Sequence, residues 1–306
     1  MAKLLQRWMV TEPYLNVRCS LGDGPHYERS TNSLRFVDII QKRLHTVNLT
    51  SGPDSLTTIQ FDIPVGVTAD VEGVHPTDKI LVGGKNGVYM LERKTGNLEL
   101  LKGFHETEDS ERDARLRSND GAIDPDGRFW IGIMNDFLVG TPKPEGSLLR
   151  INSDLSASTI LTSLTVPNGI GWSLNHKILY FTHSTASHVL AFDYIASTGS
   201  VTNERVFYYH EGPGDPDGLK IDIEGNLWLA IYGESRVLKI SPTGELVGEI
   251  TYPTSYVTCP VFVGTELWVT TGDDGKSDFA GGVFKVDVGV QGMEIFEFRL
   301  DDNGSL

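Results

Sequence analysis

Short apolar segments recur along this chain, each following a turn and each centred on a large hydrophobic residue. Six copies are present, and their central residues, used here as markers, are Phe36, Leu81, Trp130, Tyr180, Trp228 and Trp268. Successive markers lie 40 to 50 residues apart. A repeat of this length with several strands per copy is typical of a β-propeller blade.

Each copy continues into an alternating apolar–polar strand, a turn and a further strand. Val88–Leu91 leads through the turn Lys94–Asn97, and Val237–Ile240 leads through Ser241–Gly244. Alternation with a period of two between Gly, Asn and Pro predicts hairpins, and no segment keeps a helical period over three turns. A solenoid would have shorter repeats and a distinct cap at each end. We therefore predict an all-β, six-bladed β-propeller with four-stranded antiparallel blades.

The uninterrupted series of repeats predicts one domain over residues 1–306, since no Pro/Gly/Ser-rich linker divides it. A ring that stayed open would expose unpaired strand edges. We expect the strand around Met9–Val17 to pair into the last blade and close the ring.

Composition narrows the classes of partner. The chain has 26 Lys and Arg against 41 Asp and Glu, a net charge of −15, which argues against nucleic acid or anionic membranes and suits binding of a cation. No run approaches the roughly 18 apolar residues of a membrane span, and the first ten residues lack the apolar core of a signal peptide. Two cysteines make no disulfide framework. We expect a cytoplasmic protein, as a monomer or weak homo-oligomer.

Four polar residues precede their markers by 11 to 13 positions, namely Asp23, Asn119, Asn168 and Asp217. Each lies in a Gly-bounded turn, which we place just ahead of the inner strand of its blade. Equivalent positions of different blades meet at one mouth of the central tunnel, and Asp and Asn oxygens suit a hard divalent cation. Asn-Gly and Asp-Gly are also the commonest turn dipeptides, so each alone is explained by a turn. Four such residues at matching positions of four repeats favour a cation site over four unrelated turns.

The chain resembles the SMP-30 (senescence marker protein-30, regucalcin)/gluconolactonase family in several motifs. These are Gly22–Pro25, Arg117–Gly121, Asp124–Gly132, Pro167–Ser173, Asp215–Asp222 and Gly225–Trp228, within a match over about residues 15–290. The resemblance implies a six-bladed propeller that binds one divalent metal ion and hydrolyses sugar lactones.

The resemblance also implies roles for individual residues. The metal ligands would be Asp23, Asn168 and Asp217, with Asp217 as general base. Arg117 and Asn119 would contact the substrate, and so would Asp136, in a lid-like loop after Met134. Two positions depart from the family pattern, because Asp23 stands where the family usually has Glu and His183 where it usually has Asp.

The leading hypothesis is a metal-dependent lactonase. Ca²⁺ is the favoured ion and Zn²⁺, Mn²⁺ or Mg²⁺ are substitutes, since oxygen-only sites discriminate weakly between them by ligand type. A bound cation would polarise the lactone carbonyl, and Asp217 would take a proton from the attacking water. One alternative keeps the metal site but changes the substrate, to a phosphotriester or a secondary-metabolite intermediate. The other is a calcium-binding propeller without turnover, which would not need Arg117.

Overall fold

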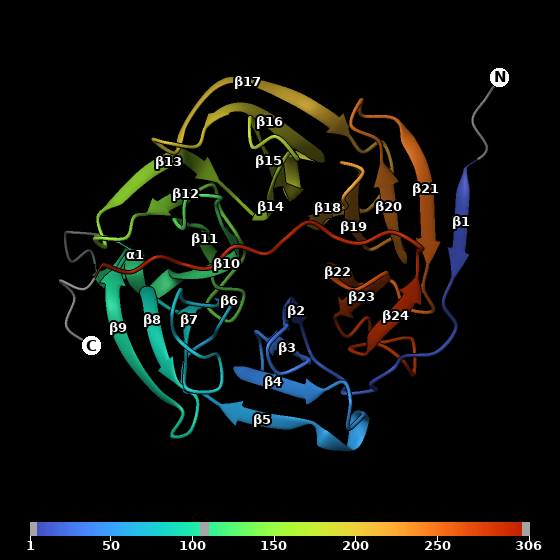
Figure 1. Ribbon diagram of the computed structural model, residues 1–306, viewed down its shortest axis with the longest axis horizontal. Coiled ribbons are helices and arrows are strands. Elements are labelled where there is room, and N and C mark those ends of the chain that lie inside the picture. Colours follow the sequence, from blue (N-terminus) through green and yellow to red (C-terminus); the bar gives the residue numbers. More distant parts are fainter. Residues whose placement is uncertain (1–4, 105–109, 302–306) are drawn as a thin grey trace.

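The computed structural model describes residues 5–104 and 110–301 and confirms the six-bladed β-propeller (Figure 1). Six antiparallel sheets stand around a central axis, each with its first strand innermost. Three short helical segments interrupt the strands in the described part of the chain: η1 (Pro53–Ser55), α1 (Ser110–Arg115) and η2 (Ser184–Ala186). None of the described helices is long and apolar enough to cross a membrane.

The blades follow one another in chain order. The first three are β2 (Gly22–Glu28), β3 (Ser33–Asp38), β4 (Arg43–Asn48) and β5 (Thr57–Gln60); β6 (Val67–Ala69), β7 (Lys79–Gly83), β8 (Gly87–Glu92) and β9 (Asn97–Gly103); and β10 (Leu116–Ile123), β11 (Phe129–Asn135), β12 (Gly146–Ile151) and β13 (Ala157–Leu164). The last three are β14 (Pro167–Trp172), β15 (Ile178–His183), β16 (His188–Ile195) and β17 (Ser200–Tyr209); β18 (Asp215–Ile221), β19 (Leu227–Tyr232), β20 (Arg236–Ile240) and β21 (Leu246–Thr251); and β22 (Val257–Val263), β23 (Glu266–Thr271) and β24 (Val283–Asp287).

The marker residues lie on the second strand of each blade, where both faces of the sheet pack against neighbouring blades. Trp130 and Trp228 are fully buried, and each indole N–H donates to a buried carboxylate, Asp124 or Asp222, at 2.9 Å. The segments carrying the candidate site residues are therefore not turns ahead of the inner strands, as expected, but the innermost strands themselves.

Closure of the ring differs from the expected pairing. The N-terminal strand β1 (Gln6–Met9) runs parallel to β21, as a fifth strand on the outside of the fifth blade (Figure 1). Its Trp8 packs against Trp228 with ring centroids 5.5 Å apart, which explains its attachment there. Tyr14 and Leu15, later in the expected segment, do meet the last blade. Leu15 forms an isolated antiparallel bridge with Val283 of the three-stranded sixth sheet, and the Tyr14 ring packs against Trp268 with centroids 4.7 Å apart.

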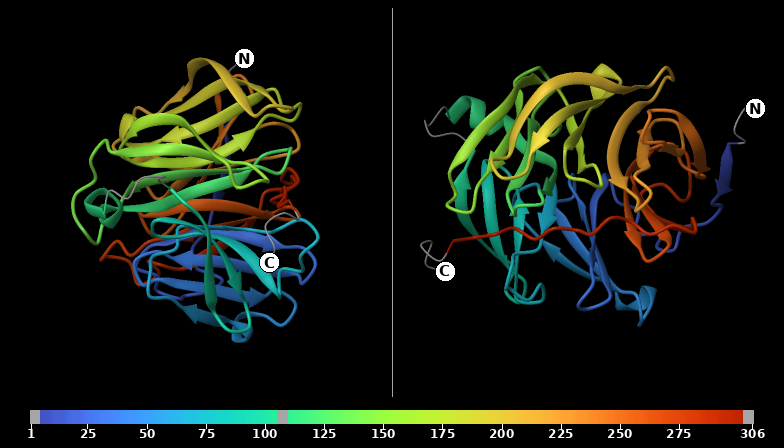
Figure 2. Two further views of the ribbon diagram at one scale, coloured as in Figure 1. Left: turned by 90° about the vertical axis from the view of Figure 1, so that its left-hand side faces the viewer. Right: turned by 45° about the horizontal axis from the view of Figure 1, so that its top comes forward.

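The C-terminal strap, residues 288–301, crosses one mouth of the central channel (Figures 1 and 2). It forms an antiparallel bridge between Gly292 and Asp222 of the fifth blade and a parallel bridge between Phe298 and Val71 of the second. Phe298 is fully buried. The strap therefore ties opposite sides of the ring together and covers this mouth.

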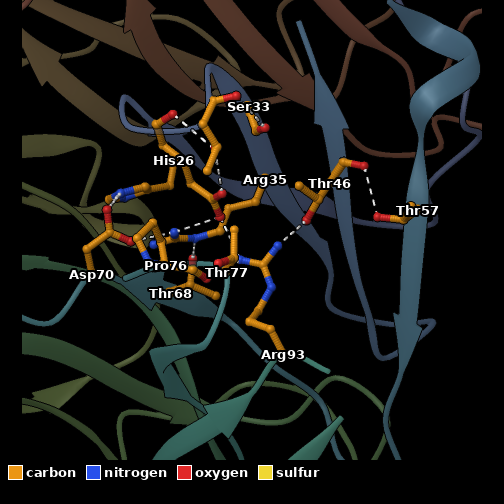
Figure 3. A network of polar contacts seen from close by, with 12 residues as sticks. His26, Ser33, Arg35, Thr46, Thr57, Thr68, Asp70, Pro76, Thr77 and Arg93 are labelled. Carbon is orange, nitrogen blue, oxygen red and sulfur yellow. Dashed lines mark hydrogen bonds and ion pairs between the residues drawn. The ribbon is translucent and has the colours of Figure 1, made fainter. Parts of the chain in front are cut away.

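A buried network of charged side chains joins the first and second blades (Figure 3), and its Asp70 accepts a hydrogen bond from the Phe298 N–H of the strap through its backbone carbonyl. Arg35 is fully buried and donates to Glu28, to Asp70 and, through Nε, to Thr68 Oγ1 at 2.8 Å. Arg93 Nη1 donates to Glu28 Oε1 at 2.6 Å, and His26 Nε2 lies 3.1 Å from Asp70 Oδ2. Each of the two carboxylates is held by two nitrogen-bearing side chains.

Candidate metal and substrate site

A β-bulge interrupts five of the six innermost strands, and in four of them it lies at the candidate residues. The register shifts fall between Asp23 and His26, Ser118 and Gly121, Pro167 and Ile170, Pro216 and Leu219, and Val257 and Cys259. A bulge adds a residue to one strand and re-aims the side chains around it. This explains how a polar residue of a buried strand can be turned out of the regular alternation.

The bulges and, in the second blade, Gly66 just ahead of β6 contact one another and close a ring around the axis. At four glycines of this ring a Cβ would come too close to the next blade. A Cβ at Gly24 would lie 3.0 Å from Gly66 O, and a Cβ at Gly66 would lie 2.5 Å from Asn119 O. A Cβ at Gly169 would lie 2.9 Å from Asp217 O, and a Cβ at Gly218 would lie 2.5 Å from Cys259 Sγ. Asn119 Nδ2 donates to Pro167 O at 3.0 Å and Thr258 Oγ1 to Gly22 O at 2.6 Å. Glycine is therefore required in this ring for close packing of adjacent strands.

Three of the candidates are linked directly. Arg117 Nη1 donates to Asn119 Oδ1 at 2.9 Å, and Asn119 Nδ2 donates to Asn168 Oδ1 at 3.1 Å. Asn168 Nδ2 donates in turn to Ser184 Oγ at 3.0 Å. The amide of Asn119 is thus fully occupied by protein partners, so in this arrangement it orients Arg117 and Asn168.

Arg117 keeps unused donors. Its side chain is 1% exposed, yet Nε and Nη2 have no hydrogen-bond partner, while Nη1 is occupied. Burial lowers the pKa of Arg117 to about 10, so the guanidinium stays charged at neutral pH. Buried donors without partners are rare in proteins and indicate a place for an absent acceptor.

Three buried carboxylates gather near the axis, Asp23, Asp120 and Asp217. Burial raises the pKa of Asp23 to about 7, and the Asp120 charge adds to the rise. Burial, with the charges of Asp23 and Asp120, raises the pKa of Asp217 well above its usual range. Among the described residues none of the three forms an ion pair within 4.0 Å, and Asp217 Oδ1 has no hydrogen-bond partner. Crowded, unpaired carboxylates favour a proton or a cation.

A metal ion fits this arrangement only with amide participation. Within residues 5–104 and 110–301, no three His, Cys, Asp or Glu side chains stand close enough to hold an ion by themselves. The expected set has two carboxylates and the Asn168 carbonyl, all on buried side chains. The orphaned Oδ1 of Asp217 and the raised pKa of both carboxyl groups are what such a donor set shows without its cation.

Asp136 lies in the loop after β11, but its carboxylate is engaged by protein groups. Oδ2 accepts from Lys85 Nζ at 2.8 Å and Oδ1 from the Leu138 backbone N–H at 3.0 Å. The next residue, Phe137, places its ring 5.0 Å from Arg117 Cζ. The loop therefore contacts the candidate site through Arg117. A cavity of about 250 Å³ beside it is lined by Arg115, Asn135, Asp136, Val139, Gly140, Thr141 and Lys143.

His183 lies one strand away from the inner ring, at the end of β15 opposite Pro167. Its Nε2 is 3.4 Å from the Thr165 backbone nitrogen, and its ring lies across that of His188. The first contact is a hydrogen bond donated by the Thr165 N–H and the second is a ring contact, so His183 has a structural role here.

Sequence reasoning missed three charged residues of this region, Asp120, Lys220 and Lys85. Asp120 directly follows Asn119, so its position in the Asn-Asp-Gly turn was a usable signal. Lys220 is three residues after Asp217 in a strand whose bulge shifts the alternation, and Lys85 comes from a different blade. Neither lysine could be placed without the tertiary fold.

The structure thus defines a six-bladed propeller with a polar, oxygen-rich site on its axis. The chain belongs to the SMP-30/gluconolactonase/LRE-like family, whose model matches residues 21–273. Regucalcin from Bos taurus is 32% identical over 302 residues, covering 94% of this chain and 97% of its own. The Bacillus subtilis protein named "Putative sugar lactone lactonase YvrE" is 28% identical, with the same coverage.

The fold has a close counterpart among solved structures. A regucalcin from Agrobacterium tumefaciens, described as a calcium-binding protein, superimposes with a TM-score of 0.86 and 24% identity, over 97% of this chain and 100% of that one. At this identity the likeness supports the fold.

Proposed function

We propose that this protein is a divalent-metal-dependent lactonase that hydrolyses a sugar lactone or a similar small cyclic ester. The observation that carries the proposal is that one buried site contains both hydrogen-bond donors without an acceptor and an acceptor without a donor. Arg117 has two hydrogen-bond donors without an acceptor, and Asp217 has an acceptor without a donor. The names of the relatives supply the reaction class, a lactone hydrolysis.

Asp23, Asn168 and Asp217 would hold the ion, with Ca²⁺ favoured because all three offer oxygen. When bound, the ion supplies a positive charge that polarises the lactone carbonyl and lowers the pKa of water. Asp23 is one methylene shorter than Glu, a difference of roughly 1.5 Å in reach.

Asp217 would act as general base. As the oxygen of water adds to the carbonyl carbon of the lactone, Asp217 accepts the proton that this water loses. The bond between the carbonyl carbon and the ring oxygen then breaks, and the proton passes from Asp217 to the departing ring oxygen. The product is one hydroxy acid, so atoms and charges balance.

Arg117 would bind the substrate through Nε and Nη2, held in place by Asn119 and stacked on Phe137. A guanidinium with two free donors suits the developing negative charge on the carbonyl oxygen or a sugar hydroxyl. Asn119 would act by positioning, and Lys85 with Asp136 would hold the loop that carries Phe137.

A second candidate function is that of a calcium-binding propeller without turnover. The Agrobacterium protein, which is described as a calcium-binding protein, is the reason to consider it. The unused donors of Arg117 argue against it, because binding of a cation does not require a buried guanidinium.

The test is a pH-stat assay on γ- and δ-lactones, sugar-derived and alkyl, with chelator and after return of each metal. Base consumption that chelator abolishes and metal restores supports the lactonase. Ion binding by calorimetry without turnover on any lactone would favour the second candidate. Turnover that chelator leaves unchanged would contradict the metal-dependent mechanism.

A further inference from the structure

A small chamber lies in the central channel between the ring of bulges and the C-terminal strap. Its volume is about 120 Å³, and residues Met293–Phe296 of the strap form its outer wall. Most of the wall is apolar, with side chains such as Val67, Ile170 and Val261. Its polar side chains include Lys220 and Asp120 on the side of the candidate metal site.

Lys220 brings a positive charge into this chamber without a matching partner. Its ammonium donates to the backbone carbonyl of the preceding Leu219 at 3.3 Å, and it forms no ion pair within 4.0 Å among the described residues. Burial alone would lower the pKa of Lys220, but Cys259, Asp120 and Asp23 raise it above its usual value. The side chain is therefore a cation at neutral pH.

The charge of Lys220 acts on Asp23, one of the carboxylates that would hold the metal ion, and on the neighbouring Asp120. It opposes the burial that raises the pKa of Asp120, and it acts likewise on Asp23. Lys220 and Asp120 line the same chamber, while Arg117 lies in the hydrogen-bonded chain with Asn119 and Asn168. Two of the three carboxylates, Asp120 and Asp23, are thus influenced by one fixed cation on the chamber side.

We infer that Lys220 sets the charge selectivity of the metal site: its ammonium occupies the chamber behind the carboxylates and weakens cation binding in proportion to the charge of the cation. The inference rests on the proposed metal site. Its physical basis is that Coulomb energy is linear in charge, so a trivalent ion is repelled half as much again as a divalent one. Lys220 acts through the field at the site and is a positioning residue.

The experiment compares Ca²⁺ and La³⁺, two ions of similar radius and different charge, on the full-length wild-type protein and on Lys220→Met. Dissociation constants are measured by calorimetry with the metal alone at pH 7.5. Removing a buried like charge should tighten Ca²⁺ binding about tenfold and La³⁺ binding about thirtyfold. The preference for La³⁺ over Ca²⁺ should therefore rise about threefold. Protons displaced from the carboxylates affect both ions equally and cancel in this ratio.

Lys239→Met is the matched control. Lys239 is a buried lysine of the same blade, on β20, whose ammonium lies 5.1 Å from the Trp228 ring, away from the candidate ligands. Its replacement should leave both dissociation constants within about twofold, because the removed charge is distant from the site. Lys220→Gln keeps a polar end in the chamber and should reproduce the ratio found for Lys220→Met.

A Lys220 variant that keeps the wild-type melting temperature and an unchanged La³⁺ to Ca²⁺ ratio would overturn the inference while leaving the metal site intact. Equal tightening of both ions would also overturn it, since that result indicates a change of shape. A wild-type protein that binds neither ion would overturn the proposed metal site, and this inference with it.

Discussion

Two buried clusters of charge in this molecule have opposite electrostatics. In the network of Figure 3, Glu28 and Asp70 are bound by arginine or histidine side chains. Although burial opposes it, Arg35 and Arg93 lower the pKa of Glu28, and His26 and Arg35 lower that of Asp70. On the axis, burial and mutual repulsion raise the pKa of Asp23 and Asp217, and neither has an ion-pair partner in the described ranges.

The difference separates a structural cluster from a candidate functional one. A buried carboxylate costs several kcal/mol in desolvation unless a partner offsets it. In the network between the first two blades, each carboxylate has its own cationic partners, and the one unpartnered polar atom of Arg35 is Nη2. The axial cluster is incomplete, so its cost is offset only when a proton or a cation is added. Local rules of charge pairing are violated on the axis, as is typical of functional sites.

Replacing Asp217 tests the incomplete cluster most strongly. Asp217→Ala should remove both the ion and the general base, so kcat/KM should fall at least about a thousandfold and calorimetry should show no metal binding. Asp215→Ala, an exposed carboxylate two residues earlier in β18, is the control and should keep activity. Full activity in Asp217→Ala would show that the site is misplaced.

Replacing Arg35 tests the complete cluster. Arg35→Met leaves Glu28 and Asp70 with less positive charge in a buried place, which should cost about 3–5 kcal/mol in the free energy of unfolding measured with denaturant. Turnover per folded molecule should not change. Arg43→Met, on the neighbouring strand β4 and half-buried, should cost less than about 1 kcal/mol. Similar losses from both variants would argue against a special role for the network.

The pH dependence of the metal-free protein should reflect the axial carboxylates. A carboxyl group whose folded pKa is raised binds more protons in the folded state, so stability falls as pH rises from the unfolded pKa through the folded one. For Asp23, with a folded pKa of about 7, the loss between about pH 4 and pH 7 is on the order of 3 kcal/mol.

Chelator-treated protein should therefore melt at a lower temperature at pH 8 than at pH 5. Asp23→Asn should flatten this slope. A saturating divalent ion should do the same, because the ion replaces the proton. A melting temperature that rises steadily over this range in the metal-free protein would contradict the assignment.

Arg117→Ala should have the smallest of these effects. Loss of its two free donors should raise KM about tenfold for a hydroxylated lactone, with the metal dissociation constant within a few-fold of wild type. Arg150→Ala, on β12 of the same blade, removes an arginine whose Nη1 bonds Thr198 O and Gly199 O, and it should leave KM unchanged. Weakened metal binding in Arg117→Ala would instead assign Arg117 to the ion site.

Much of the fold could be predicted because the features that define each repeat lie within a short stretch of sequence. Alternation, turn residues and a large buried residue such as Trp130 or Trp228 recur in every blade, and each blade needs the same packing against its neighbours. The placement of β1 could not be predicted, because it depends on the packing of Trp8 against Trp228, which lies 220 residues away in the sequence. A contact with a distant blade produces no recognisable pattern in the residues around Trp8.

The candidate site was predicted from the matching positions of polar residues in different repeats and from the family resemblance. Together they predicted that Asp23, Asn168 and Asp217 form one site. What could not be foreseen are the bulges in five of the six inner strands and the hydrogen bonds that occupy Asn119 and Asp136. These depend on the register between strands, which is set by pairing over the whole sheet.

The amino-acid sequence by itself determined the number of blades, the polar residues of the inner strands and the family, since these follow from spacing and residue type. Only the tertiary structure decided which charges are paired and which are left without partners. Pairing depends on distances of a few ångströms between blades. It places Arg35 between Glu28 and Asp70, and it leaves Lys220 in the chamber without an ion pair among the described residues.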